Sequence, residues 1–258
     1  MKVLCLLLIL CSCAPSGPPV ADLSFRADAI GGPYSNKRAE LFVPPGPGPF
    51  SAVVVLHGCD GVGPHYRAWA GQLRDWGYAA LLVDSFRPRG VSNTCNQGML
   101  VPPLSQAQDA FAAADYLRGL PNIRADRIGV IGFSHGGWAV LKAVLEDTVK
   151  QDRATPFVAA VAFYPGCERP GSALATDTLI LIGDADDWTP PAACRRWSDE
   201  VQRAGHALQM KVYPGALHGF DAQHMPSFYA GHHTGRDPAA AEDALLMTRE
   251  FLAQHLAR

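Results

Sequence analysis

The chain has 258 residues, of which 48% are hydrophobic, and a formal net charge of −2 at pH 7. This length and hydrophobic content predict one globular domain with a large core. The near-neutral charge lacks the basic excess of nucleic-acid-binding proteins, so we expect no nucleic-acid partner.

The first residues are typical of an export signal. Lys2 precedes a short apolar run, Val3 to Leu10, which is too short to span a bilayer. Residues Leu10-Cys11-Ser12-Cys13 resemble a bacterial lipobox, although cysteine is unusual at the position of Cys11. We therefore expect a periplasmic or cell-envelope protein, attached to a membrane only through lipid on Cys13; soluble export is the alternative. The expected division is a leader over 1–13, a tether over 14–22 and one domain over 23–258.

Four cysteines lie outside the leader. They are Cys59, Cys95, Cys167 and Cys194. An even number of cysteines in an exported chain indicates disulfides, and four cysteines allow three pairings. We favour Cys59–Cys95 and Cys167–Cys194, because each pair would join neighbouring loops of the fold expected below. Four free thiols are the alternative.

Strand-like and helix-like segments alternate along the chain. The expected strands are 23–30, 38–43, 51–56, 78–83, 128–133, 157–164, 178–182 and 208–213. The expected helices are 66–76, 105–120, 135–145, one that begins near Pro190, and one from Asp237-Pro238 to about Leu256. This alternation predicts an α/β fold, with a mostly parallel central sheet and helices on both faces. Residues 84–102 form a long loop, and such loops are often functional.

A serine motif follows the strand at 128–133. Residues Gly132-Phe133-Ser134-His135-Gly136 have the G-x-S-x-G spacing of a nucleophile elbow. There the serine occupies a sharp turn from strand to helix, and the flanking glycines let the turn pack closely. The pentapeptide alone can occur by chance in a glycine-rich chain. A strand-like run before it and a helix-like run after it favour Ser134 as a catalytic nucleophile.

An acid and a base follow Ser134 in the chain order of α/β-hydrolases. Asp184, Asp186 and Asp187 follow one predicted strand, and His218 follows the next. Open α/β sheets place their sites just beyond the carboxyl ends of strands. We predict Asp186 as the acid because it stands four residues before a proline; Asp187 is the alternative, and Asp184 is expected in a turn. His218 is the predicted base, since an imidazole titrates near neutral pH.

The glycine-rich loop His57-Gly58-Cys59-Asp60-Gly61 follows an early buried strand. An α/β-hydrolase places half of its oxyanion hole there, whereas the alternative is a plain turn. The predicted donors are the backbone N–H groups of Cys59 and His135. The side chains of His57 and His135 are expected to shape the loop rather than to act as general bases.

Nothing in the sequence indicates a metal or another cofactor. His224, His232 and His233 lie in an irregular segment without Cys or Glu at ligand spacing. We expect no metal site, no cofactor and no partner beyond a small-molecule substrate.

From Arg38 to the C-terminus the chain resembles the dienelactone hydrolase family. The resemblance rests on VVLHGCDG (54–61), GYAALLVDSF (77–86), RIGVIGFSHGG (127–137), AFYPG (162–166), GDADDWTP (183–190) and YPGALHGFD (213–221). It implies one α/β-hydrolase domain without a large lid, cofactor-free hydrolysis of esters or lactones, and a triad of Ser134, Asp186 and His218.

Two departures from the family pattern affect the expected substrate. Dienelactone hydrolases proper use a cysteine nucleophile, whereas this chain has Ser134, and they carry a glutamate in the oxyanion loop, which here reads His57-Gly58-Cys59. Both departures fit a serine esterase that forms an acyl-enzyme, and they argue against dienelactone itself as the substrate. The alternatives are a small peptidase of related fold and a non-catalytic binding lipoprotein on a hydrolase scaffold.

Overall fold

The structure is a computed structural model that describes residues 21–26, 36–167, 173–203 and 207–256. The expected leader and most of the expected tether lie outside these residues. The first strand begins at Ala21, two residues before the expected start of the domain. In the described part of the chain, no helix has the length and apolar character needed to cross a membrane.

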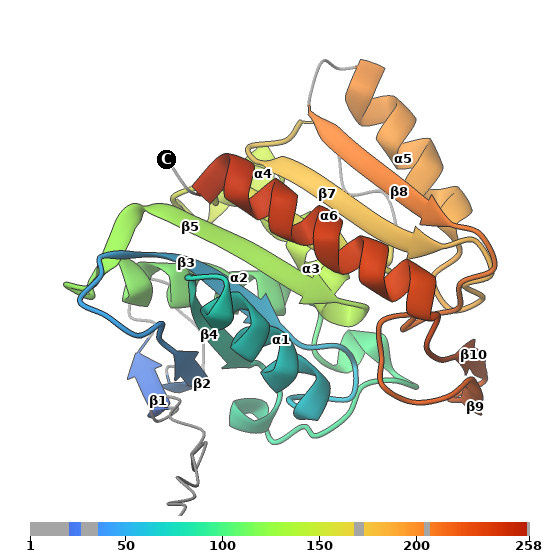
Figure 1. Ribbon diagram of the computed structural model, residues 1–258, viewed down its shortest axis with the longest axis horizontal. Helices are drawn as coiled ribbons and strands as arrows, with labels where there is room; N and C mark the ends of the chain where they lie inside the picture. The colour runs from blue at the N-terminus through green and yellow to red at the C-terminus, as the bar shows by residue number, and fades with distance from the viewer. Residues whose placement is uncertain (1–20, 27–35, 168–172, 204–206, 257–258) are drawn as a thin grey trace, which may run out of the picture.

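The domain is built on an eight-stranded sheet (Figure 1). Its strands are β1 (Ala21–Arg26), β2 (Asn36–Phe42), β3 (Phe50–Leu56), β4 (Ala79–Asp84), β5 (Ile123–Phe133), β6 (Ala159–Phe163), β7 (Asp177–Gly183) and β8 (Leu208–Tyr213). They lie in the order β1-β2-β4-β3-β5-β6-β7-β8. The pairs β1–β2 and β2–β4 are antiparallel, and all other neighbours are parallel. The predicted mostly parallel sheet is therefore confirmed.

Helices cover both faces of this sheet. They are α1 (Pro64–Asp75), α2 (Pro103–Arg118), α3 (His135–Ala143), α4 (Glu146–Gln151), α5 (Pro191–Arg203) and α6 (Pro238–Leu256). Helices α1 and α6 lie in front of the sheet in Figure 1, and α2 and α3 lie behind it. No large lid domain is present in the described part of the chain.

The central strands are covered by helices on both faces, as their composition predicts. Every residue of 52–56 in β3 and 79–83 in β4 is fully buried. Parallel strands covered on both faces are continuous apolar runs, because neither face meets water. These strands form the middle of the core and fix the positions of the loops at their carboxyl ends.

Several features differ from the elements expected, and β5 begins at Ile123 rather than at residue 128. Helix α3 ends at Ala143 rather than at residue 145, because Leu145 leaves the helix to form an antiparallel bridge with Leu174. The short helix α4 then follows. The loop 84–102 contains two 3-10 turns, η1 (Arg87–Arg89) and η2 (Gly98–Leu100).

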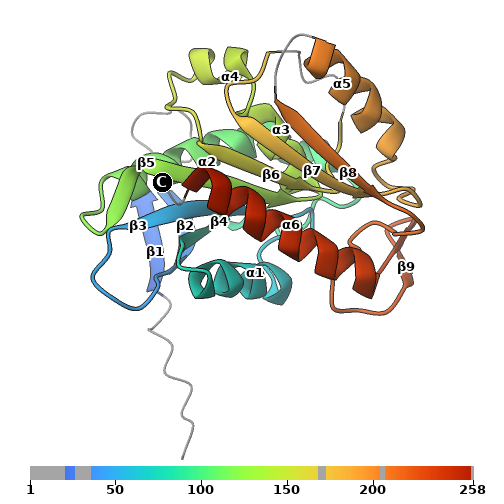
Figure 2. The ribbon, with the colours of Figure 1, turned by 45° about the horizontal axis from the view of Figure 1, so that its top comes forward.

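A further difference is a small hairpin in the segment expected to be irregular. It consists of β9 (Ser227–Tyr229) and β10 (His232–Thr234), paired antiparallel. Figures 1 and 2 place it beyond the carboxyl ends of β7 and β8. The hairpin therefore lies on the side of the sheet where the predicted site residues gather.

Candidate active site

Ser134 occupies a strained turn between β5 and α3. Its φ is 52° and its ψ is −113°, a region that residues other than glycine rarely adopt. A Cβ atom on Gly132 would collide with the carbonyl oxygen of Gly136. A Cβ atom on Gly136 would lie 2.5 Å from the carbonyl oxygens of Leu56 and His57. The two glycines of the motif thus permit the tight turn that lifts Ser134 above the sheet.

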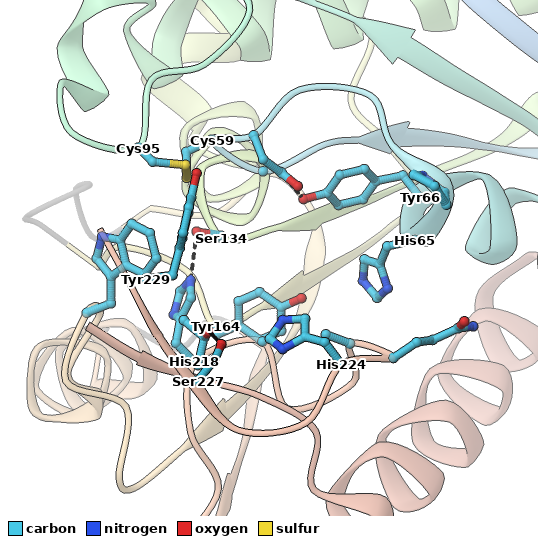
Figure 3. Close-up of a pocket in the computed structure, with 18 residues that line it drawn as sticks. Cys59, His65, Tyr66, Cys95, Ser134, Tyr164, His218, His224, Ser227 and Tyr229 are labelled. Atoms are coloured by element: carbon cyan, nitrogen blue, oxygen red, sulfur yellow. Dashed lines mark hydrogen bonds between the residues drawn. A yellow bond between two sulfur atoms is a disulfide. The ribbon is translucent and has the colours of Figure 1, made fainter. Parts of the chain in front are cut away.

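The structure brings Ser134, His218 and Asp186 together. His218 Nε2 lies 2.9 Å from Ser134 Oγ, and His218 Nδ1 lies 2.8 Å from Asp186 Oδ2. The two side chains of the His–Asp pair are almost completely buried. Figure 3 shows His218 pointing at Ser134 across the wall of a cavity. A serine, a buried imidazole and a buried carboxylate in this order can transfer a proton from the hydroxyl.

Neighbouring groups hold the Asp186 carboxylate in place. Asp186 Oδ1 accepts hydrogen bonds from the backbone N–H groups of Trp188 and Thr189, at 2.9 and 2.8 Å. The hydroxyl of Thr189 donates to Asp186 Oδ2 at 2.9 Å. These bonds fix the carboxylate oxygen that faces His218.

The two other aspartates of this loop point elsewhere. Asp187 Oδ2 lies 2.7 Å from His233 Nδ1, and Asp187 also accepts the backbone N–H of His233. The hydrogen bond from His233 lowers the pKa of Asp187 below its ordinary value. Asp184 accepts the backbone N–H of Gly215 at 2.5 Å, as a turn residue does. Only Asp186 among the three contacts His218.

Cys59 and His135, the predicted oxyanion donors, line one cavity together with Ser134. Cys59 follows β3, and His135 begins α3 directly after the serine. Within the described residues, neither backbone N–H donates a hydrogen bond. The N–H of Ser134 itself is occupied by the carbonyl of Phe163, at 2.9 Å. The two free N–H groups are therefore available to a negatively charged oxygen.

The side chains of His57 and His135 point away from Ser134 Oγ. His57 is fully buried, its Nδ1 donates to the Gly58 carbonyl, and its Nε2 accepts the N–H of Ser85. His135 contacts the Gln106 side chain and the Gly98 carbonyl through its two ring nitrogens. Burial lowers the pKa of both imidazoles. Both rings therefore hold loops together.

Both predicted disulfides are present. Cys59–Cys95 joins the loop after β3 to the loop 84–102, with the Cα atoms 4.7 Å apart. The Thr94 N–H also donates to the Cys59 carbonyl at 2.8 Å. Cys167–Cys194 joins the segment after β6 to α5. The first disulfide places a covalent restraint directly on a predicted oxyanion residue.

A buried polar cluster next to the cavity is not predicted by the sequence. Asp221 accepts hydrogen bonds from Trp69 Nε1 and Tyr164 OH, each at 2.8 Å. His65 Nε2 lies 3.3 Å from Asp221 Oδ2 as an ion pair, without the alignment of a hydrogen bond. The Tyr164 ring in turn packs edge-on against the His218 ring. Asp221 thus anchors three aromatic or imidazole side chains, of which His65 and Tyr164 line the cavity.

This cavity has a volume of about 660 Å³ and contains Ser134 and His218 in its wall. It falls within the range of about 300–1,000 Å³ that small-molecule sites occupy. Around it, in the described residues, no three His, Cys, Asp or Glu side chains lie in an arrangement that could hold a metal ion.

Two known proteins are similar in sequence to this chain over most of its length. A carboxymethylenebutenolidase from Rhodococcus opacus is 27% identical, with 96% of this chain and 98% of that protein covered. A Bradyrhizobium sp. protein named "Probable 2-oxo-3-(5-oxofuran-2-ylidene)propanoate lactonase" is also 27% identical, over 88% of this chain and 93% of its own.

A solved structure shows the same fold. It is a dienelactone hydrolase-like promiscuous phosphotriesterase from metagenomic libraries, with a TM-score of 0.73 and 20% identity, covering 92% of this chain and 98% of its own. Residues 38–256 match the model of the Dienelactone hydrolase family. Because this match spans most of the chain, the protein belongs to the dienelactone hydrolase family.

Proposed function

We propose that the protein is a serine hydrolase that cleaves a carboxylic ester or lactone through an acyl-enzyme. The observation that carries this proposal is the alignment of Ser134 Oγ, the His218 ring and Asp186 Oδ2, with successive contacts of 2.9 and 2.8 Å. The names of the two relatives, a lactonase and a carboxymethylenebutenolidase, support the same reaction class.

Each residue of the proposed triad has a distinct role. His218 Nε2 takes the hydroxyl proton of Ser134 as its Oγ attacks the carbonyl carbon of the substrate. Asp186 orients the imidazole and stabilises the imidazolium that forms. His218 then gives the proton to the departing alcohol oxygen, and a water molecule activated by His218 hydrolyses the acyl-enzyme.

The backbone N–H groups of Cys59 and His135 stabilise the oxyanion in this proposal. Both residues line one cavity together with Ser134, and neither N–H has a hydrogen-bond acceptor among the described residues. Donors that are already in position need no reorganisation when charge develops on the oxygen. Losing one such donor typically costs about 3–4 kcal/mol of transition-state stabilisation. The disulfide on Cys59 holds one of the two donors in position.

Labelling with a fluorophosphonate probe, followed by mass spectrometry, tests the nucleophile. We expect an adduct on Ser134 in the wild type, and its loss in Ser134→Ala and His218→Ala. Ser227→Ala is the matched control, because Ser227 lines the same cavity and its hydroxyl contacts only Thr234 Oγ1 among the hydrogen bonds described. A folded wild type that takes no label and hydrolyses no ester or lactone would contradict the proposal.

We further propose export and lipid attachment through Cys13. Two disulfides in the described part of the chain support an oxidising compartment, since cytosolic thiols are kept reduced. Cys13→Ser is expected to release the full-length protein from the membrane fraction, whereas the control Cys11→Ser leaves it there. Unchanged membrane association of Cys13→Ser would contradict lipid attachment at that residue.

A further inference from the structure

Ser134 lies between two cavities of unequal size. The larger has a volume of about 660 Å³ and the smaller about 280 Å³. Ser134, Trp188 and the Cys59–Cys95 disulfide line both cavities. From this arrangement we infer that the smaller cavity holds the acyl group of the substrate and the larger cavity holds the alcohol group. The inference rests on the proposed function and adds a substrate class to it.

The position of His218 decides which cavity receives the leaving group. His218 lines the larger cavity and does not line the smaller one. During acylation the bond from Ser134 Oγ to the carbonyl carbon forms, and the bond from that carbon to the alcohol oxygen breaks. The proton that left Ser134 passes through His218 Nε2 to the alcohol oxygen. The alcohol oxygen must therefore lie beside His218, with the rest of the alcohol in the larger cavity.

The acyl chain is the remaining substituent of the reacting carbon, and only the side that faces away from His218 is left for it. One position of the tetrahedral carbon is taken by Ser134 Oγ, one by the oxyanion and one by the leaving oxygen. The oxyanion faces the N–H groups of Cys59 and His135 in the proposed mechanism. The acyl chain then extends away from His218 into the smaller cavity. His135 lines that cavity and is absent from the walls of the larger one.

The walls of the smaller cavity limit the length of the acyl chain. They include Trp138, Pro190, Ala193 and the Cys167 half of the second disulfide. The Trp138 ring also packs against Gly166, where an added Cβ atom would lie 3.2 Å from the ring. The smaller cavity's volume of about 280 Å³ is less than half the 660 Å³ of the larger cavity, so the acyl group is the smaller of the two substituents.

The larger cavity accommodates a bulkier group with aromatic character. Tyr66, Tyr164, Trp188 and Tyr229 contribute rings to its wall. Figure 3 shows Tyr229 and Tyr164 on either side of His218. Aromatic walls favour flat, ring-containing ligands, because ring pairs gain energy beyond the burial of their area. The substrate class inferred is therefore an ester that joins a smaller acyl group to a larger, ring-containing alcohol.

Two matched substitutions test the assignment. Ala193 lines only the smaller cavity and Ala222 only the larger one, so Ala193→Leu and Ala222→Leu add the same atoms to different walls. Each variant is assayed with p-nitrophenyl esters of increasing acyl length and with acetates of alcohols of increasing size. The readout is the kcat/KM of the variant divided by that of the wild type for each ester, which cancels the intrinsic reactivity of the substrates.

For Ala193→Leu we expect this ratio to fall by about tenfold or more from the shortest to the longest acyl chain and to stay constant across the acetates. For Ala222→Leu we expect it to fall with alcohol size and to stay constant across the acyl series. Trp138→Ala should extend hydrolysis to longer acyl chains, and misfolding cannot produce such a gain.

The opposite pattern, in which Ala193→Leu discriminates among alcohols, would overturn the assignment while leaving the proposed function intact. Equal losses for every ester in Ala193→Leu, without a gain in Trp138→Ala, would also overturn it. A wild type that hydrolyses none of these esters and takes no fluorophosphonate label on Ser134 would overturn the proposed function and this assignment together.

Discussion

Asp187 Oδ2 lies 2.7 Å from His233 Nδ1, so the carboxylate next to Asp186 binds the β9–β10 hairpin instead of His218. Asp187 also accepts the backbone N–H of His233. Two adjacent aspartates thus serve different partners, one inside the site and one at its rim. The structure separates two residues that the sequence leaves as alternatives.

Substituting each aspartate in turn should separate these roles. Asp186→Asn keeps the shape of the side chain but removes the charge that stabilises the imidazolium, and we expect kcat to fall by about 10⁴-fold. Asp187→Asn should change kcat by less than about tenfold, because its partner is the hairpin. Steady-state hydrolysis of p-nitrophenyl acetate measures both. Equal losses in the two variants would mean that the hairpin contact is as important as the buried pair.

The His65–Asp221 pair should make stability depend on pH. Burial opposes the charged form of His65, but the Asp221 carboxylate outweighs it, and the pKa of His65 is raised above 6.5. Burial also opposes the charged form of Asp221, but His65 together with Tyr164 and Trp69 outweighs it, and the pKa of Asp221 is lowered below 3.8. The contribution of His65 is full below about pH 6.5 and is lost as pH rises through its folded pKa. That of Asp221 is present above about pH 3.8 and is lost as pH falls through its folded pKa.

Urea unfolding of wild type and His65→Gln across pH tests this expectation. The difference in free energy of unfolding should be larger at about pH 5.5 than at about pH 9, because the contribution of His65 is lost as pH rises through its folded pKa. Asp221→Ala should cost about 3 kcal/mol, because it leaves the partly buried His65 and two buried donors without their acceptor. A pH-independent difference for His65→Gln would show that the pair is not ionised.

The two disulfides should have different effects when removed. Cys95→Ser frees the loop that carries the Cys59 N–H, so we expect kcat to fall by about ten- to a hundredfold with little change in KM. Replacing Cys167 and Cys194 together should mainly lower stability, by about 3.5 kcal/mol for a sequence separation of 27 residues in the chain-entropy model. Kinetics and urea unfolding of both variants distinguish the effects. An unchanged kcat in Cys95→Ser would show that the Thr94–Cys59 hydrogen bond alone positions the loop.

Much of the fold follows from local patterns in the sequence. Runs such as 52–56 and 78–83 are apolar throughout, so they are either strands covered on both faces or buried helices. Their short length favours strands. The sequence does not predict the hairpin, because all three residues of β9 are exposed and each of its strands has only three residues. Strands this short leave no apolar periodicity to detect.

The candidate site also contains some residues that the sequence predicts and others that it does not. Ser134 and His218 stand next to strand ends in a recognisable order, so the sequence alone selects them as candidates, whereas it leaves Asp187 as an alternative to Asp186. The cluster around Asp221 joins residues far apart in the chain, with Trp69 and Asp221 separated by 152 positions. No local pattern records such a contact, because it depends on how α1 packs beside the loop after β8. The two cavities likewise depend on loop packing rather than on any motif.

The close packing around Gly132 in β5 predicts that a larger residue there destabilises the protein. A Cβ atom on Gly132 would collide with the Gly136 carbonyl oxygen and lie 2.5 Å from its carbonyl carbon, both backbone atoms that cannot rotate away. On Gly129, in the same strand, the nearest atoms are the Ala159 carbonyl oxygen and a Leu256 methyl carbon, each at 3.2 Å. Gly132→Ala should therefore destabilise the protein by about 3 kcal/mol or more and displace Ser134, whereas Gly129→Ala should cost about 1 kcal/mol. Unfolding measurements and the rate of fluorophosphonate labelling report the two effects separately. If Gly132→Ala labels at the wild-type rate, the glycine is not required to hold Ser134 in its strained turn.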